Sequence, residues 1–90
     1  MKIARIDGST VRTPEELHNC LQDELEFPEY YGKNLDALYD VLTDLPDETW
    51  IYISAEPALR SVLGEYWERF LRVFSDAQQE NARLKLVLLH

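Results

Sequence analysis

The sequence predicts an α/β fold in which three parallel strands pack against about four helices in the order βααβααβ. Two observations lead to this fold class. Three short runs have strand-like composition, at residues 2–7, 50–53 and 84–89. Two segments with a helical spacing of apolar residues separate each run from the next, and such crossovers join parallel strands. Because the chain has 90 residues, we expect one domain over residues 1–90 with one hydrophobic core.

Local signals mark the first strand and the first helix. Residues 2–7 mostly alternate between polar and apolar side chains and precede a turn-prone Gly-Ser pair. Thr13 is a good helix N-cap, because its hydroxyl accepts a hydrogen bond from a free amide, and a proline takes the first helical position after it. Leucines then recur every four residues on one face until a Phe-Pro pair interrupts the pattern. We therefore expect a helix over residues 14–26.

A second helix and the second strand follow. Asn34 is well suited to cap a helix over residues 35–44, and Pro46 prevents that helix from continuing. The apolar residues of this helix form one stripe, which consists of Leu35, Leu38, Val41 and Leu42. Residues 50–53 are β-branched or aromatic and predict the second strand, in which we expect Trp50 to be packed in the core.

The last third of the chain predicts two helices and a strand. Pro57 opens a short helix that Gly64 ends. Large apolar residues at helical spacing then predict a longer helix whose stripe belongs to the core: Trp67, Phe70, Leu71, Phe74 and Ala77. Residues 84–89 are almost continuously apolar, so we expect a buried final strand and a sheet covered by helices.

The composition limits the classes of function. Nine Lys and Arg against seventeen Asp and Glu give a net charge of −8, which disfavours direct binding to nucleic acid or to anionic membranes. The single Cys20 cannot form an internal disulfide, and no apolar run is long enough to span a bilayer. We therefore expect a soluble cytoplasmic protein. Its acidic charge is concentrated in residues 13–59, which hold twelve acids and one base.

Three aspartates lie on one face of the predicted helix over residues 35–44. Asp36, Asp40 and Asp44 are four residues apart, so their carboxylates form an acidic strip opposite the leucine stripe. Like charges at this spacing destabilise a helix by about 0.2–0.5 kcal/mol per pair. The strip is either a solvated surface or an interface for a cationic partner. The interface is favoured by the flanking tyrosines, Tyr30, Tyr31 and Tyr39.

The sequence offers little for catalysis or metal binding. His18 and Cys20 are two residues apart and do not face each other on a helix, so a Cys-His nucleophilic pair is not supported. A structural zinc site needs four ligands, whereas the chain has two His and one Cys. The acids of the strip lie on a helix and not in a calcium-binding loop. We expect no enzyme activity, no metal and no cofactor.

The segment Phe-Pro-Glu-Tyr-Tyr-Gly-Lys-Asn-Leu-Asp-Ala-Leu-Tyr-Asp at residues 27–40 closely resembles the signature of the barstar family, intracellular inhibitors of secreted bacterial ribonucleases. The resemblance covers essentially the whole chain and includes residues 71–77. It implies a barstar-like fold with a three-stranded parallel sheet. It also implies that the chain, a monomer when free, inhibits a basic, barnase-like, guanyl-preferring ribonuclease in a 1:1 complex.

The same resemblance implies the residues that bind the partner. Asp40 would enter the ribonuclease active site in place of a substrate phosphate, supported by Asp36 one turn earlier, and Tyr30 would pack near the catalytic histidine of the enzyme. The other implied contacts are Asn34, Leu35, Tyr39, Thr43 and, from the last long helix, Asp76.

Asp44 and Leu45 depart from the family pattern and change the rim of the expected interface. They leave open a second hypothesis, in which the chain is an interaction or immunity module that binds another basic protein or toxin nuclease through the same acidic face.

Overall fold

The computed structural model describes residues 1–90, and its centre is a three-stranded parallel sheet. The strands β1 (Lys2–Asp7), β2 (Thr49–Ser54) and β3 (Leu84–Leu88) lie in the order β1-β2-β3. In this register Ile6 lies opposite Ile53, which lies opposite Leu88. The predicted fold class is therefore confirmed.

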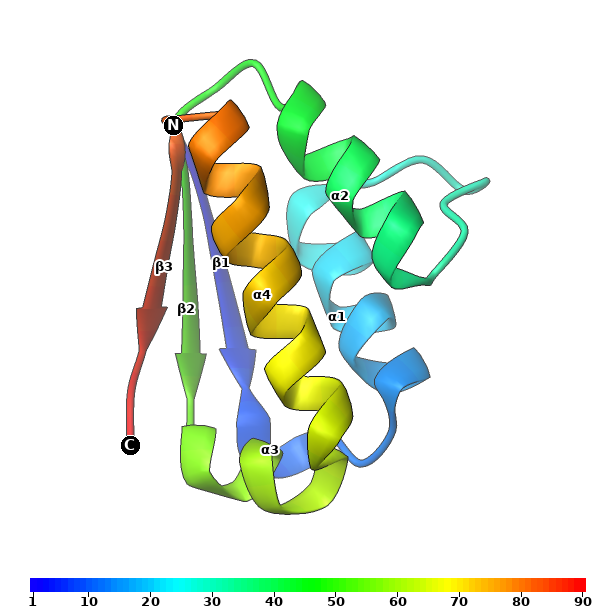
Figure 1. Cartoon of the computed structure of the whole chain (residues 1–90), viewed down its shortest axis with the longest axis vertical. Helices are drawn as coiled ribbons and strands as arrows, with labels where there is room; N and C mark the ends of the chain where they lie inside the picture. The colour runs from blue at the N-terminus through cyan, green and yellow to red at the C-terminus, as the bar shows by residue number, and fades with distance from the viewer.

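The helices lie on one side of this sheet (Figure 1). They are α1 (Pro14–Leu25), α2 (Leu35–Asp44), α3 (Glu56–Leu63) and α4 (Glu65–Glu80). The side chains of Thr13 and Asn34 cap α1 and α2 as predicted, since each accepts a hydrogen bond from the third helical amide. The end of α1 is set by Glu26, which takes a left-handed conformation.

A short 3-10 turn, η1 (Gly8–Thr10), follows β1 at the Gly-Ser pair from which a turn was predicted. The Asp7 carboxylate accepts hydrogen bonds from the Ser9 amide and hydroxyl, which lowers the pKa of that carboxyl. A β-carbon on Gly8 would lie 2.4 Å from the Ser54 carbonyl oxygen. The close passage of β2 therefore requires a glycine here.

The core lies between the sheet and the helices and contains one cluster of 19 buried hydrophobic residues. The predicted stripe of α4 is largely in it: Trp67, Phe70, Phe74 and Ala77 are buried, and Leu71 packs against them. From the sheet, Ile51 and Ile53 of β2 are completely buried. The core therefore forms where the apolar stripes of the helices meet one face of the sheet.

The opposite face of the sheet has no helix over it, which corrects two expectations (Figure 1). Trp50 and Tyr52 alternate with the buried isoleucines of β2, and their rings stack on this open face with 6.2 Å between centroids. Trp50 is thus half-buried, and the prediction that it is packed in the core was wrong. In β3 only Leu84 is buried, so the prediction of a buried final strand was also wrong. A continuous apolar run shows that a strand can be buried, but not how many faces are covered.

Candidate functional site

Both ends of α2 are held by side-chain hydrogen bonds, so its orientation is well defined. At its start, the Asn34 Oδ1 atom accepts a hydrogen bond from the Ala37 amide at 2.8 Å. At its end, the buried Asn81 side chain, just after α4, donates to the Leu42 and Leu45 carbonyl oxygens at 2.9 and 3.0 Å. Carbonyls in the last turn of a helix lack the usual amide partner four residues on, and the Leu42 oxygen otherwise accepts only the long, 3.5 Å bond from the Leu45 amide. Sequence reasoning did not assign Asn81, because it lies 39 residues from Leu42 along the chain.

The acidic strip lies on the solvent side of α2, as predicted. Asp36, Asp40 and Asp44 are exposed, whereas Leu38 and Leu42 on the other side of the helix are buried. None of the three carboxylates forms an ion pair within the chain. The three carboxylates are therefore accessible to a cationic partner.

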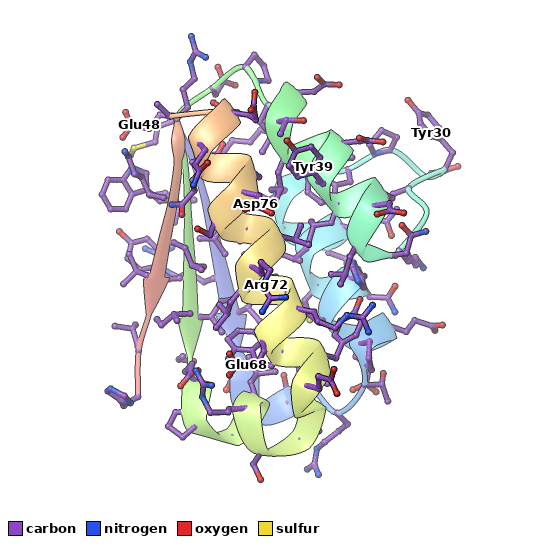
Figure 2. The ribbon with its side chains drawn as sticks, viewed as in Figure 1. Tyr30, Tyr39, Glu48, Glu68, Arg72 and Asp76 are labelled. Carbon is purple, nitrogen blue, oxygen red and sulfur yellow. The ribbon has the colours of Figure 1, made fainter.

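The remaining predicted partner contacts surround the strip. Tyr30 is 88% exposed in the loop before α2, while Leu35 and Tyr39 are half-buried. The Thr43 hydroxyl donates to the Tyr39 carbonyl at 2.9 Å and is thus occupied by its own helix. Asp76 is exposed on α4, and Figure 2 shows it beside the helix that carries Tyr39. The packing of α2 on α4 thus places Asp76 close to the predicted surface.

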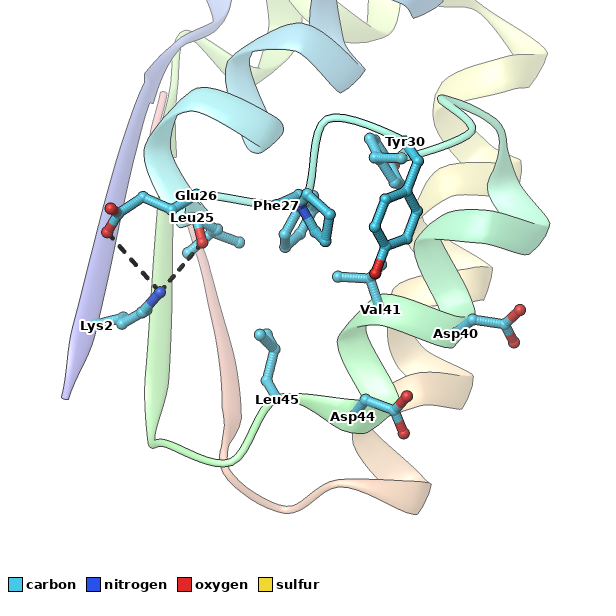
Figure 3. A pocket seen from close by; sticks show the side chains of 11 residues that line it. Lys2, Leu25, Glu26, Phe27, Tyr30, Asp40, Val41, Asp44 and Leu45 are labelled. Atoms are coloured by element: carbon cyan, nitrogen blue, oxygen red, sulfur yellow. Dashed lines mark hydrogen bonds and ion pairs between the residues drawn. The ribbon is translucent and has the colours of Figure 1, made fainter.

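A hollow of about 400 Å³ opens between the end of α1, the following loop and the second half of α2 (Figure 3). Its apolar lining includes Phe27, Val41 and Leu45, while Asp40 and Asp44 line it from α2. On the far side, the Lys2 ammonium donates to the Leu25 carbonyl and lies 4.0 Å from the Glu26 carboxylate. Apolar walls with carboxylates at one side suit a cationic side chain that has an aliphatic stem.

No site for a metal ion is present, because no three His, Cys, Asp or Glu side chains come together in a suitable group. Cys20 and His18, the two side chains considered for nucleophilic chemistry, lie in different environments. Cys20 is a free, half-buried thiol, whereas His18 is buried and bonded to two tyrosines. No helix of the chain is both long and apolar enough to cross a membrane.

Comparison with known proteins identifies a family and a relative of this chain. Residues 1–89 match the family described as "Barstar (barnase inhibitor)". The chain belongs to the barstar family. It is also 42% identical over 78 residues to "Putative ribonuclease inhibitor YrdF" of Bacillus subtilis (strain 168), an overlap of 83% of this chain and 84% of that protein. Barstar proteins are inhibitors and not enzymes, in agreement with the prediction that this chain catalyses no reaction.

In this barstar-family chain, a buried histidine holds the loop that carries Tyr30. The His18 Nδ1 and Nε2 atoms lie 2.6 Å from the hydroxyls of Tyr31 and Tyr66, respectively. A neutral imidazole has one donor and one acceptor nitrogen, so one phenol donates to the ring and the other accepts from it. The two bonds connect α1 to the loop and to α4. Sequence analysis missed this role, although His18 shares the face of Leu21 and Leu25 at helical spacing.

Burial disfavours the charged form of His18 and so lowers its pKa, and it raises the pKa values of Tyr31 and Tyr66. In the unfolded chain, a histidine takes up a proton near pH 6.5, whereas folded His18 does so only at lower pH. Between these two pKa values the unfolded state binds more protons, so protonation favours unfolding. The stability that depends on neutral His18 is therefore complete above about pH 6.5 and is lost as the pH falls through the folded pKa.

We expect the free energy of unfolding to fall by up to about 1.4 kcal/mol per pH unit within that interval. Urea denaturation between pH 7.5 and pH 5, followed by circular dichroism, measures this slope. His18→Gln is the matched variant, because its amide retains hydrogen bonding but does not titrate. Equal slopes for the wild type and His18→Gln would contradict the assignment.

Proposed function

We propose that the chain, as a single cytoplasmic domain, inhibits a basic, barnase-like, guanyl-preferring ribonuclease by covering its active site in a 1:1 complex. The observation that carries this proposal is the acidic strip of α2, three exposed carboxylates without ion pairs in a barstar-family chain. A ribonuclease active site holds basic groups arranged for phosphate. Such groups can donate charge-assisted, bidentate hydrogen bonds to a carboxylate.

In this complex each predicted residue has a defined part. Asp40 takes the place of a substrate phosphate, and Asp36 adds negative charge one turn earlier. Tyr30, as an exposed ring, covers the region of the enzyme's catalytic histidine. The surrounding contacts come from Asn34, Leu35, Tyr39, Thr43, Asp44 and Asp76. The inhibitor blocks access of RNA and performs no chemistry itself.

Titration of a barnase-like ribonuclease with the purified chain tests this proposal. We expect RNA cleavage to fall linearly and to end at one equivalent of the chain, because a tight complex removes active enzyme in proportion to the inhibitor added. A ribonuclease of unrelated fold serves as the control and should keep its activity. Full activity of every barnase-like enzyme in the presence of excess folded chain would contradict the proposal.

A second candidate function uses the same surface for a different basic protein, such as a toxin nuclease of another type. It is favoured by Asp44 and Leu45, which line the hollow beside Asp40 and depart from the family pattern. If this function is correct, the chain forms a stable complex with that protein and does not inhibit barnase-like enzymes. The titration above therefore distinguishes the two candidates.

A further inference from the structure

A second hollow, of about 390 Å³, lies at the start of α2, where the chain presents positive charge. Lys33 and Arg69 line it from the loop before α2 and from α4, together with Tyr66 and Asp36. Lys33 is the one basic residue among residues 13–59. This end of α2 therefore carries two cations beside Asp36, whereas the other end carries the acids Asp40 and Asp44.

Neither cation has an anionic partner inside the chain. Lys33 and Arg69 are exposed, and no ion pair involves either of them, although Asp36 lines the same hollow. The Arg69 guanidinium lies over the Tyr66 ring, 5.9 Å from its centroid, and this contact positions it beside the hollow. Two unpaired cations around one hollow form a site that attracts an anion.

Lys33 takes a left-handed backbone conformation just before α2. Its φ angle is 54°, in the left-handed region that glycine and asparagine adopt at lower cost. A lysine is conformationally less favourable at this position than a glycine or an asparagine would be. What it presents to solvent is an ammonium group directly before the Asn34 cap of α2.

The two cations lie on the surface to which we assign the ribonuclease. Arg69 and Asp76 are seven residues apart on α4, so they share one face of that helix. Asp76 is a predicted partner contact, and Figure 2 shows it next to α2. Lys33 precedes Asn34 and Leu35, which are predicted contacts as well. A partner that covers the acidic strip and Asp76 therefore also reaches the hollow between Lys33 and Arg69.

We propose that this hollow receives an Asp or Glu side chain of the inhibited ribonuclease, which pairs with Lys33 and Arg69. The inference rests on the proposed function and specifies the partner further. Beside the basic cluster that meets Asp40, the enzyme carries a carboxylate at the place that faces the start of α2. The charge pattern of the inhibitor, with only acids at the end of α2 and two cations beside Asp36 at its start, thereby selects among basic ribonucleases and sets the orientation of the complex.

Neutralising Arg69 should have opposite effects on the affinity for the enzyme, depending on whether Arg69 pairs with an enzyme carboxylate or only adds to the surface charge. Arg69→Gln changes the net charge from −8 to −9, so long-range attraction to a basic enzyme alone would strengthen binding. Loss of a pairing with an enzyme carboxylate would instead weaken binding through faster dissociation. The variant Lys85→Gln makes the same change of net charge on the strand β3, on the open face of the sheet, and is the matched control.

The experiment measures association and dissociation rates of a barnase-like ribonuclease with wild type, Arg69→Gln, Lys33→Gln and Lys85→Gln. We expect the dissociation rate to rise about tenfold for Arg69→Gln and Lys33→Gln, since a hydrogen bond to a charged group is lost, and to stay unchanged for Lys85→Gln. Arg69→Lys, which retains the charge, should recover most of the affinity. The carboxylates of the enzyme should also be neutralised one at a time. For the enzyme variant that lacks the pairing carboxylate, Arg69→Gln should no longer change the dissociation rate.

Binding of Arg69→Gln and Lys33→Gln as tight as that of Lys85→Gln would overturn the inference. If Asp40→Ala abolishes inhibition in the same assays, the proposed function stands and only the pairing falls. If the wild type does not inhibit the enzyme, the proposed function and the pairing both fall.

Discussion

Asp40→Ala is expected to weaken binding of the ribonuclease about 100- to 5,000-fold. Asp40 is exposed on α2 and has no ion pair in the free chain, so its carboxylate is ready to bind. In the proposed complex it is surrounded by enzyme guanidinium and imidazole groups and loses contact with water. Removing one member of such a buried, hydrogen-bonded charge pair leaves the other charges unpaired, which costs about 3–5 kcal/mol. The effect should appear mainly as faster dissociation.

Inhibition of RNA cleavage and the dissociation rate of the complex measure this effect. Glu65→Ala is the matched control, because it also removes one exposed carboxylate but lies at the start of α4, outside the predicted contacts. It should change binding by less than about threefold. Stoichiometric inhibition by Asp40→Ala, as by the wild type, would exclude Asp40 as the central contact.

His18→Ala is expected to lower the free energy of unfolding by about 3–5 kcal/mol. The substitution leaves a cavity in a fully buried position, and it also removes the partner of two hydroxyls, those of Tyr31 and Tyr66. Since Tyr31 belongs to the loop before α2, the loop should lose one of its attachments to α1 and keep the hydrogen bond from the Gln22 side chain to the Pro28 carbonyl. Binding of the ribonuclease should weaken as well, because Tyr30 is the adjacent residue.

Urea denaturation at pH 7.5 compares His18→Ala with His90→Ala, which removes an exposed imidazole and should be nearly neutral. Where His18→Ala fails to fold, Tyr66→Phe provides the milder test. It removes one hydroxyl and retains the ring, so a loss of about 1 kcal/mol is expected. Wild-type stability of Tyr66→Phe would show that its bond to His18 contributes nothing to the free energy of folding.

The elements of this fold could be predicted because their signals are local. Thr13 and Asn34 cap the helices that follow them, because each side chain accepts a hydrogen bond from an amide only three residues further along the chain. The spacing of Asp36, Asp40 and Asp44 likewise places three carboxylates on one helix face before any tertiary contact is considered. The order of strands and helices then restricts the topology to a parallel sheet with crossovers.

The candidate site could be predicted only in part for the same reason. The residues of α2 share a face through helical periodicity alone. The approach of Asp76 and Arg69, by contrast, depends on how α4 packs against α2. Similarly, Trp50 lies on an open sheet face, since alternation along β2 defines two faces but does not indicate which one the helices cover.

By itself, the sequence determined the helices, the strands, the acidic strip and the resemblance to the barstar family. These follow from contacts over a few residues and from a continuous motif. Only the tertiary structure decided which sheet face is covered, and it revealed the bonds of His18 to residues 13 and 48 positions away. It also brought Lys33 and Arg69 to one hollow. Such contacts join distant parts of the chain, and their partners become defined only when the apolar faces of the elements pack together.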